Sequence, residues 1–73
     1  MFIYTRHAER RIEQRRLFKA QIEEAVLQPD KVLPGFKKRK LAQRDFSGNI
    51  LEVVYRREGN TTVILTAYWL EED

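Results

Sequence analysis

The amino-terminal segment carries the side chains best suited to proton transfer and anion binding. His7, Arg11 and Arg15 are spaced by four residues, so on a helix they share one face. His7 is the only histidine, and histidine gains and loses a proton near neutral pH, which makes it the candidate general acid or base. A row of cations is favourable when an anion such as phosphate lies against it. The alternative is a solvated face on which Glu9 and Glu13 pair with neighbouring arginines.

A second basic segment follows a Pro-Gly turn in the middle of the chain. It runs from Lys37 to Lys40 and is followed by Arg44. Clustered Lys and Arg bind the phosphates of nucleic acids, and they also keep an exposed edge strand from pairing with another chain. Lys38, Lys40 and Arg44 are therefore candidates for phosphate binding.

The carboxy-terminal half offers a third group of polar side chains at alternating positions. It consists of an acid, a cation, a hydroxyl and an aromatic ring: Glu52, Arg56, Thr66 and Tyr68. Alternation places these residues on one face of a sheet if their strands pair in register. That face would then be able to bind a polar ligand.

The charge is unevenly distributed along the 73 residues, whose net charge is +3. Residues 1–40 hold eleven Lys or Arg against five acids, a balance of +6, whereas residues 41–73 hold three against six, a balance of −3. Such polarity suits phosphate groups or an acidic protein partner. The expected partners are RNA and an acidic protein.

Several classes of chemistry are excluded by composition. One histidine without cysteine does not make a metal site, no Gly-rich loop is followed by Lys-Ser or Lys-Thr, and Ser47 lies in a turn without triad partners. We expect no metal and no cofactor. The absence of cysteine, of a signal sequence and of an apolar run of membrane-spanning length predicts a cytoplasmic protein with no membrane contact.

The candidate residues must be positioned by a small α+β domain spanning residues 1–73. Thr5 is suited to cap a helix that continues through Arg16, and a second helix is expected from Phe18 to Leu27 with Phe18 on its buried face. After Pro29 the spacing of the apolar residues changes from a helical period to a period of two. Four strands are expected, of which the first is a short edge strand: 31–33, 38–46, 50–57 and 61–69. The pattern predicts two helices packed on one face of a three- to four-stranded antiparallel meander.

Alternation also assigns the faces of the last two strands. The side chains expected to meet the helices are Leu51, Val53, Tyr55, Val63, Leu65, Ala67 and Trp69. The open face is expected to carry Glu52, Val54, Arg56, Thr62, Ile64, Thr66 and Tyr68, joined by Arg44 from the preceding strand. Val54 and Ile64 would then be apolar and exposed, which leaves open a homodimer that buries this face.

The motifs resemble a family of bacterial domains. These motifs are Thr5-Arg6-His7-Ala8, Arg11, Gln14-Arg15, Leu51 to Tyr55 and Val63 to Tyr68, and they extend over nearly the whole chain. The chain resembles the domains of unknown function indexed as DUF4258, which open with a His-Ala-x-x-Arg helix and close on a Thr-x-Tyr strand. Those domains look like relatives of the RelE and BrnT toxins, in which helices pack on a curved antiparallel sheet that binds and cuts RNA.

This resemblance implies a metal-independent endoribonuclease toxin inhibited by an acidic antitoxin. The ribose 2′-hydroxyl would attack the adjacent phosphate, with His7 in proton transfer and Glu52 as the rival base. Charge stabilisation would fall to Arg11, Arg44 and Arg56, and Tyr68 would stack on a base or protonate the leaving oxygen. Further phosphate contacts would come from Arg15, Lys38, Lys40 and Thr66. The alternative is a module of the same fold that binds RNA or an acidic protein without cleavage.

Overall fold

The computed structural model describes residues 1–70 of the chain, which form two helices, one turn of 3₁₀ helix and five strands. In chain order the elements are β1 (Phe2–Tyr4), α1 (Arg6–Arg15), α2 (Lys19–Leu27), β2 (Lys31–Pro34), η1 (Phe36–Lys38), β3 (Lys40–Phe46), β4 (Asn49–Glu58) and β5 (Thr61–Trp69). The α+β class is therefore confirmed. No helix within residues 1–70 is both long and apolar enough to cross a bilayer.

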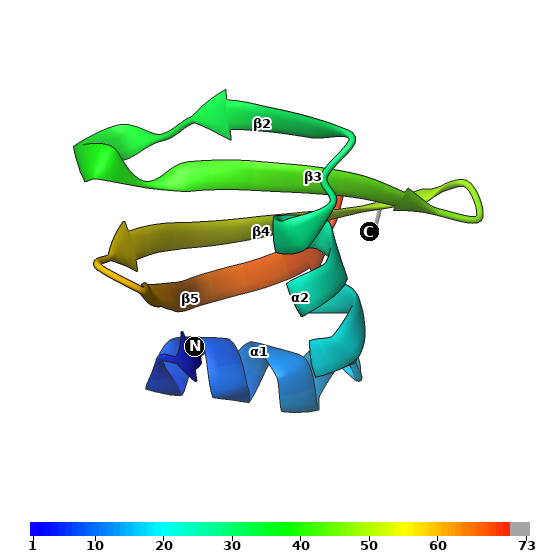
Figure 1. Ribbon diagram of the computed structural model, residues 1–73. Helices are drawn as coiled ribbons and strands as arrows, with labels where there is room; N and C mark the ends of the chain where they lie inside the picture. The colour runs from blue at the N-terminus through cyan, green and yellow to red at the C-terminus, as the bar shows by residue number, and fades with distance from the viewer. Residues whose placement is uncertain (71–73) are drawn as a thin grey trace.

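The strands form one mixed sheet in the order β1-β5-β4-β3-β2 (Figure 1). The four strands from β2 to β5 are the antiparallel meander that the sequence predicts. The prediction of a purely antiparallel sheet of three to four strands is wrong, because Phe2–Tyr4 forms a fifth strand parallel to β5. Three residues are too short to show a strand period, and their pairing partner lies some sixty residues further along the chain.

Helix α1 begins and ends with the local signals expected of a helix. Thr5 is extended, and its hydroxyl accepts a hydrogen bond from the Ala8 amide over 3.0 Å, which satisfies one of the free amides of the first turn. At the other end Arg16 adopts a left-handed φ of 54°, and the Leu17 amide donates to the Ile12 carbonyl over 2.9 Å. This termination reverses the chain direction and places Leu17 in the core.

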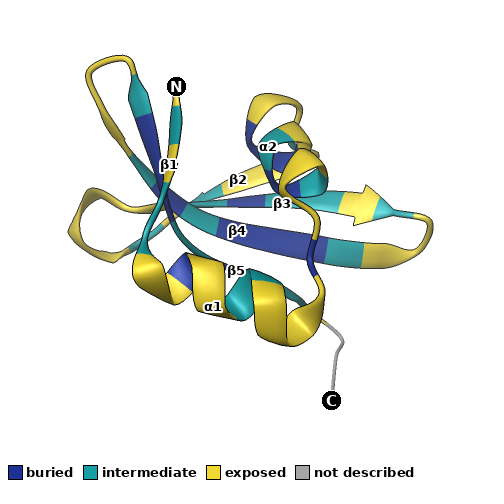
Figure 2. Ribbon diagram, turned by 90° about the horizontal axis from the view of Figure 1, so that it is seen from below, coloured by how far each residue is buried: buried dark blue, intermediate teal, exposed yellow. Residues whose placement is uncertain are grey.

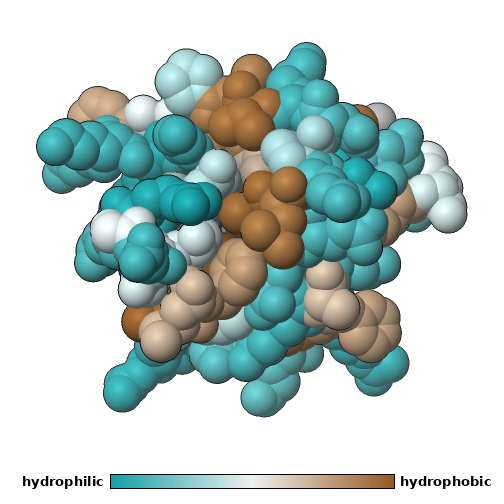
Figure 3. All heavy atoms as spheres, in the orientation of Figure 1, coloured by the Kyte–Doolittle hydropathy of each residue, from teal (hydrophilic) through white to brown (hydrophobic). Residues whose placement is uncertain are grey.

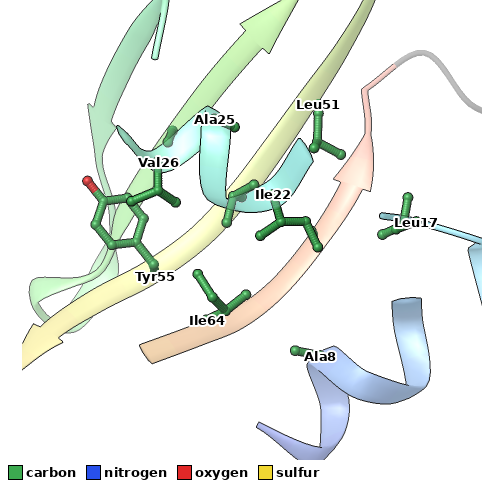
Figure 4. Packing of buried hydrophobic residues seen from close by; sticks show 11 residues of the cluster. Ala8, Leu17, Ile22, Ala25, Val26, Leu51, Tyr55 and Ile64 are labelled. Atoms are coloured by element: carbon green, nitrogen blue, oxygen red, sulfur yellow. The ribbon is translucent and has the colours of Figure 1, made fainter. Parts of the chain in front are cut away.

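Helix α2 covers β3 and β4, and α1 runs beside β5 (Figures 1 and 2). The buried residues of α2 are Ile22, Ala25 and Val26, which point toward Tyr55 and the neighbouring core residues of the sheet (Figure 4). Phe18 is 67% exposed, so its predicted burial is wrong. It occupies the N-cap with an extended backbone and therefore lies outside the periodicity of the helix. The face seen with α2 in front is mainly hydrophilic, with separate apolar patches (Figure 3).

A β-bulge in β5 changes which residues meet the helices. Val54 is opposite Thr66 and Tyr55 is opposite Ile64, so Leu65 is an extra residue in β5. Ala67 lies in the core as predicted, but before the bulge the prediction is reversed, because Ile64 is fully buried in the core cluster. Thr62 and Ile64 share the helix side, whereas Val63 lies opposite Arg56 on the other side. Ile64 is therefore not exposed on the open face, and it does not support a homodimer through that face.

Candidate functional site

The face of the sheet opposite α2, which we call the open face, carries the predicted polar set. Leu51, Val53 and Tyr55 are buried on the helix side, so the residues between them point the other way. The ladder pairs Glu52 with Tyr68 and Val54 with Thr66. The structure thus places Glu52, Arg56, Thr66 and Tyr68 on one face, as the alternation predicts.

Glu52 lies at the centre of the polar part of this face. Its side chain is only 7% exposed, and each carboxylate oxygen accepts a hydrogen bond. Gln43 Nε2 donates to Oε1 over 2.7 Å from β3, and the Tyr68 hydroxyl donates to Oε2 from β5. A buried carboxylate is costly unless donors satisfy it, so three neighbouring strands together hold this group.

Tyr68 is held in its protonated form by these surroundings. Burial, followed by the hydrogen bond to Glu52 and the negative charge of Glu52, raises the pKa of Tyr68 to about 12. The positive charge of Arg11 acts in the opposite direction on this pKa, so the guanidinium lies near the phenol. At neutral pH the site therefore presents a phenolic proton beside a cation.

Helix α1 brings Arg11 to the open face because Thr5 attaches the start of the helix to β5. The Thr5 amide donates to the Ile64 carbonyl over 3.1 Å, and its hydroxyl donates to the Leu65 carbonyl over 3.1 Å. From that point α1 and β5 run in the same direction (Figure 1). A helix rises about 1.5 Å per residue and a strand about 3.3 Å. Six residues of helix therefore match three of strand, which brings Arg11 level with Tyr68.

The same rise places His7 about level with Thr66. His7 is exposed and lies one turn before Arg11, so the two side chains project from the same side of α1. Arg15 is exposed one turn after Arg11. The helical row that the sequence predicts is thus present, and its middle member is the one shown to reach the polar part of the open face.

Two buried polar atoms at this place have no hydrogen-bond partner within the described chain. They are the Arg11 Nε and the Thr66 Oγ1. Buried polar atoms without partners are rare in folded proteins and call for a functional explanation. Thr66 lies two residues from Tyr68 on the same face of β5, and Arg11 lies near the phenol, so a small movement of these side chains would let a bound anion accept hydrogen bonds from both. We call the five residues Arg11, Gln43, Glu52, Thr66 and Tyr68 the open-face cluster.

Arg56 shares the open face but is separate from the open-face cluster. It lies four residues from Glu52 on β4, about 13 Å along the strand. Its Nε is 2.5 Å from Oε2 of the exposed Glu58. The structure therefore does not bring Arg56 together with Glu52 and Tyr68.

Arg44 does not lie on the open face, so its predicted place is wrong. It is opposite Leu51 in the ladder and therefore points to the helix side. Its Nε forms an ion pair with Oε2 of Glu24 at 2.9 Å, and its Nη1 donates to the Gln28 carbonyl over 2.6 Å. A cation is favourable at the C-terminal end of a helix. Arg44 thus stabilises the end of α2 and is not part of the candidate site.

Lys38 and Lys40 belong to a separate surface. Both are exposed, and they lie where the chain passes from η1 into β3. Lys40 is opposite Tyr55, three residues along β3 from Gln43 and hence about 10 Å from it. We call residues 36–40 the basic turn.

Gln43 is the member of the open-face cluster that sequence reasoning missed. The signal that would have found it is the Ser47-Gly48 turn, in which both residues have positive φ, 58° and 95°. Such two-residue turns pair the residues that flank them, here Phe46 with Asn49. Counting back along the hairpin from that pair places Gln43 opposite Glu52, and Arg44 opposite Leu51.

Comparison with protein-family models gives a match over most of the chain. The family model described as "Domain of unknown function (DUF4258)" matches residues 4–69, a range that includes every residue of the open-face cluster. A search of curated proteins and a search of solved structures found no match.

Proposed function

The chain belongs to the DUF4258 family, and we propose that it is a metal-independent endoribonuclease of the bacterial toxin type, acting in the cytoplasm. One observation carries this proposal. The Tyr68 hydroxyl is held by the buried carboxylate of Glu52 beside the Arg11 guanidinium, where the Arg11 Nε and the Thr66 hydroxyl have no partner in the described chain. A proton donor, a cation and free polar groups around one point suit a phosphodiester.

The proposed reaction is an internal transfer at phosphorus. His7 takes the proton of a ribose 2′-hydroxyl, whose oxygen attacks the adjacent phosphorus. The bond from phosphorus to the 5′ oxygen breaks, and Tyr68 gives its proton to that oxygen. The products are a 2′,3′-cyclic phosphate and a 5′-hydroxyl end. Arg11 stabilises the charge on the non-bridging oxygens, and Thr66 donates to one of them.

Glu52 has two conceivable roles, of which positioning fits the geometry better. Both of its oxygens accept hydrogen bonds, and the residue is nearly inaccessible. A general base must reach the proton that it takes, and the exposed His7 has the freer access. In this proposal Glu52 orients the Tyr68 hydroxyl, and Gln43 orients Glu52.

The second candidate function is a module that binds RNA or an acidic protein without cutting it. It is favoured by the charge of residues 1–40, a balance of +6, which attracts an anion whether or not a proton moves. The ribonuclease implies RNA as ligand and an acidic antitoxin as partner, whereas the binding module implies either RNA or an acidic protein. A homodimer that buries the open face would compete with both.

The experiment that tests the proposal is incubation of the purified protein with labelled RNA in excess chelator. The variants are His7→Ala, Arg11→Ala and Tyr68→Phe. Arg10→Ala is the matched control, because it removes the same charge from α1, at a surface hollow lined by Arg6, Glu9 and Glu13. We expect cyclic-phosphate ends from the unaltered chain and from the control, with losses of about 100-fold or more in the three variants.

Two outcomes would contradict the proposal. RNA that stays intact under all conditions but is bound by the protein would favour the binding module. Cleavage that falls equally in the Arg10 control and in the Arg11 variant would mean that net charge, rather than the open-face cluster, sets the rate. Light scattering on the same samples shows whether the protein is a dimer, which a buried open face would require.

A further inference from the structure

The basic turn presents an aromatic ring to solvent in a way that the proposed reaction does not explain. Phe36 is 77% exposed, the most exposed aromatic side chain among the described residues. It is followed by four consecutive cations, residues 37–40, and no acidic residue occurs between positions 31 and 44. Burial in a core would be the usual position for such a ring.

The backbone holds this ring outward in an uncommon conformation. Lys37 and Lys38 both have left-handed φ values, 55° and 65°, which side chains other than glycine rarely adopt. The turn is closed by the Gly35 amide, which donates to the Arg39 carbonyl over 2.7 Å, and by the Arg39 amide, which donates to the Phe36 carbonyl over 3.2 Å. Backbone strain of this kind concentrates at functional sites.

Gly35 permits the close approach that the turn requires. A Cβ at this position would lie 2.9 Å from the Arg39 carbonyl oxygen, which is closer than atoms of that size approach. The turn therefore depends on a residue without a side chain where its two ends meet. The result is a turn whose backbone is set before any ligand binds, so little backbone entropy is lost on binding.

We propose that Phe36 is a stacking platform for an unpaired base of a single-stranded nucleic acid, with the cations of the basic turn on the flanking phosphates. The Lys37 Nζ lies 5.8 Å from the centre of the Phe36 ring, so a charge and a flat apolar surface are offered together. Each nucleotide presents this same combination, a π-face beside a phosphate. A membrane surface would need a larger apolar area than one ring.

The basic turn and the open-face cluster lie along the same strand. Lys40 begins β3, and Gln43 of the cluster follows three residues later, about 10 Å away. Lys40 is opposite Tyr55 and points to the helix side, whereas Gln43 points to the open face, so a single strand of several nucleotides that contacts both passes around the end of β3. The identity of the ligand as RNA rests on the proposed function, whereas stacking on Phe36 is a property of any single strand.

The test uses single-stranded DNA, because it lacks the 2′-hydroxyl and so measures binding without cleavage. A fluorescent oligonucleotide is titrated with the unaltered chain and with Phe36→Ala, Phe36→Leu and Phe36→Tyr, at two salt concentrations. Phe18→Ala is the matched control, since it removes another exposed aromatic ring at the start of α2. Stacking predicts that Phe36→Ala and Phe36→Leu weaken binding by about 5- to 100-fold, whereas Phe36→Tyr and Phe18→Ala keep it.

Four outcomes would overturn the inference. Unchanged affinity in Phe36→Ala would exclude stacking, and retained affinity in Phe36→Leu would show an apolar contact instead. Equal losses in Phe36→Ala and Phe18→Ala would show that neither position is specific. Binding to vesicles of anionic lipid is measured in parallel. If Phe36→Ala weakens binding to the vesicles but not to the oligonucleotide, the ring contacts a membrane. RNA cleavage is measured separately, so failure of the stacking inference and failure of the proposed ribonuclease give different results.

Discussion

The Tyr68 hydroxyl donates a hydrogen bond to the Glu52 carboxylate directly across the β4–β5 ladder. Because Glu52 is nearly inaccessible and also accepts from Gln43, this pair links three strands at the centre of the open face. The pair therefore couples the stability of the sheet to the proposed chemistry, and substitutions there have two measurable effects.

Tyr68→Phe removes the hydroxyl and keeps the ring. We expect the free energy of unfolding to fall by about 1–3 kcal/mol, since a buried oxygen of Glu52 loses its donor, and RNA cleavage to fall by about 100-fold or more. Urea unfolding and the cleavage assay measure the two effects. Tyr55→Phe is the control, because its ring lies on the helix side of the same sheet. Equal effects of the two substitutions would contradict a special role for Tyr68.

The stability of the protein should depend on alkaline pH through Tyr68. Its pKa is raised from 10.0 to about 12, so the fold favours the protonated phenol. This contribution is fully present below pH 10 and is lost as the pH rises toward 12. We expect the free energy of unfolding to fall more steeply over this range in the unaltered chain than in Tyr68→Phe. The pKa of Tyr4 is also raised, by burial and by Glu23. Because Tyr4 is present in both proteins, its contribution cancels in the comparison. Parallel plots of the free energy of unfolding against pH for the two proteins would contradict the prediction.

Arg44 and Arg11 should show opposite phenotypes. Arg44→Ala removes the ion pair with Glu24 and the hydrogen bond to Gln28, so we expect a loss of about 1–2 kcal/mol in stability with cleavage unchanged. Arg11→Ala removes a cation whose Nε has no partner in the described chain, so no hydrogen bond of that atom is broken, and we expect a smaller loss of stability than in Arg44→Ala while cleavage is lost. Thermal unfolding and the cleavage assay on both variants decide this. A cleavage defect in folded Arg44→Ala would return Arg44 to the site.

Arg16→Gly should stabilise the fold. Arg16 has a left-handed φ of 54° at the C-cap of α1, where glycine has no steric cost, so we expect the free energy of unfolding to rise by about 1 kcal/mol. The same substitution at Arg10, in the interior of α1, should lower it by about 1 kcal/mol. Urea unfolding of the two variants measures the difference. Destabilisation by both would show that the Arg16 side chain contributes more than its backbone strain costs.

The local elements were predictable because neighbouring residues determine them. Thr5 caps α1 through a hydrogen bond within four residues, and β5 begins at Thr61 and ends at Trp69 as its composition indicates. The two-residue turn at Ser47 sets the register of β3 and β4. Alternation then places Glu52 and Tyr68 on one face. The family resemblance, now confirmed over residues 4–69, rests on the same local motifs.

Other features depend on contacts between distant parts of the chain. Phe2–Tyr4 becomes a strand only because the edge of β5 is free to accept it in parallel. The bulge at Leu65 moves Ile64 into the core, and no alternation rule signals an inserted residue. The approach of Arg11 to Tyr68 depends on where Thr5 attaches to β5. Sequence pattern thus determined which side chains could do chemistry, whereas tertiary packing decided which of them meet, because one extra residue or one edge pairing changes the position of every side chain beyond it.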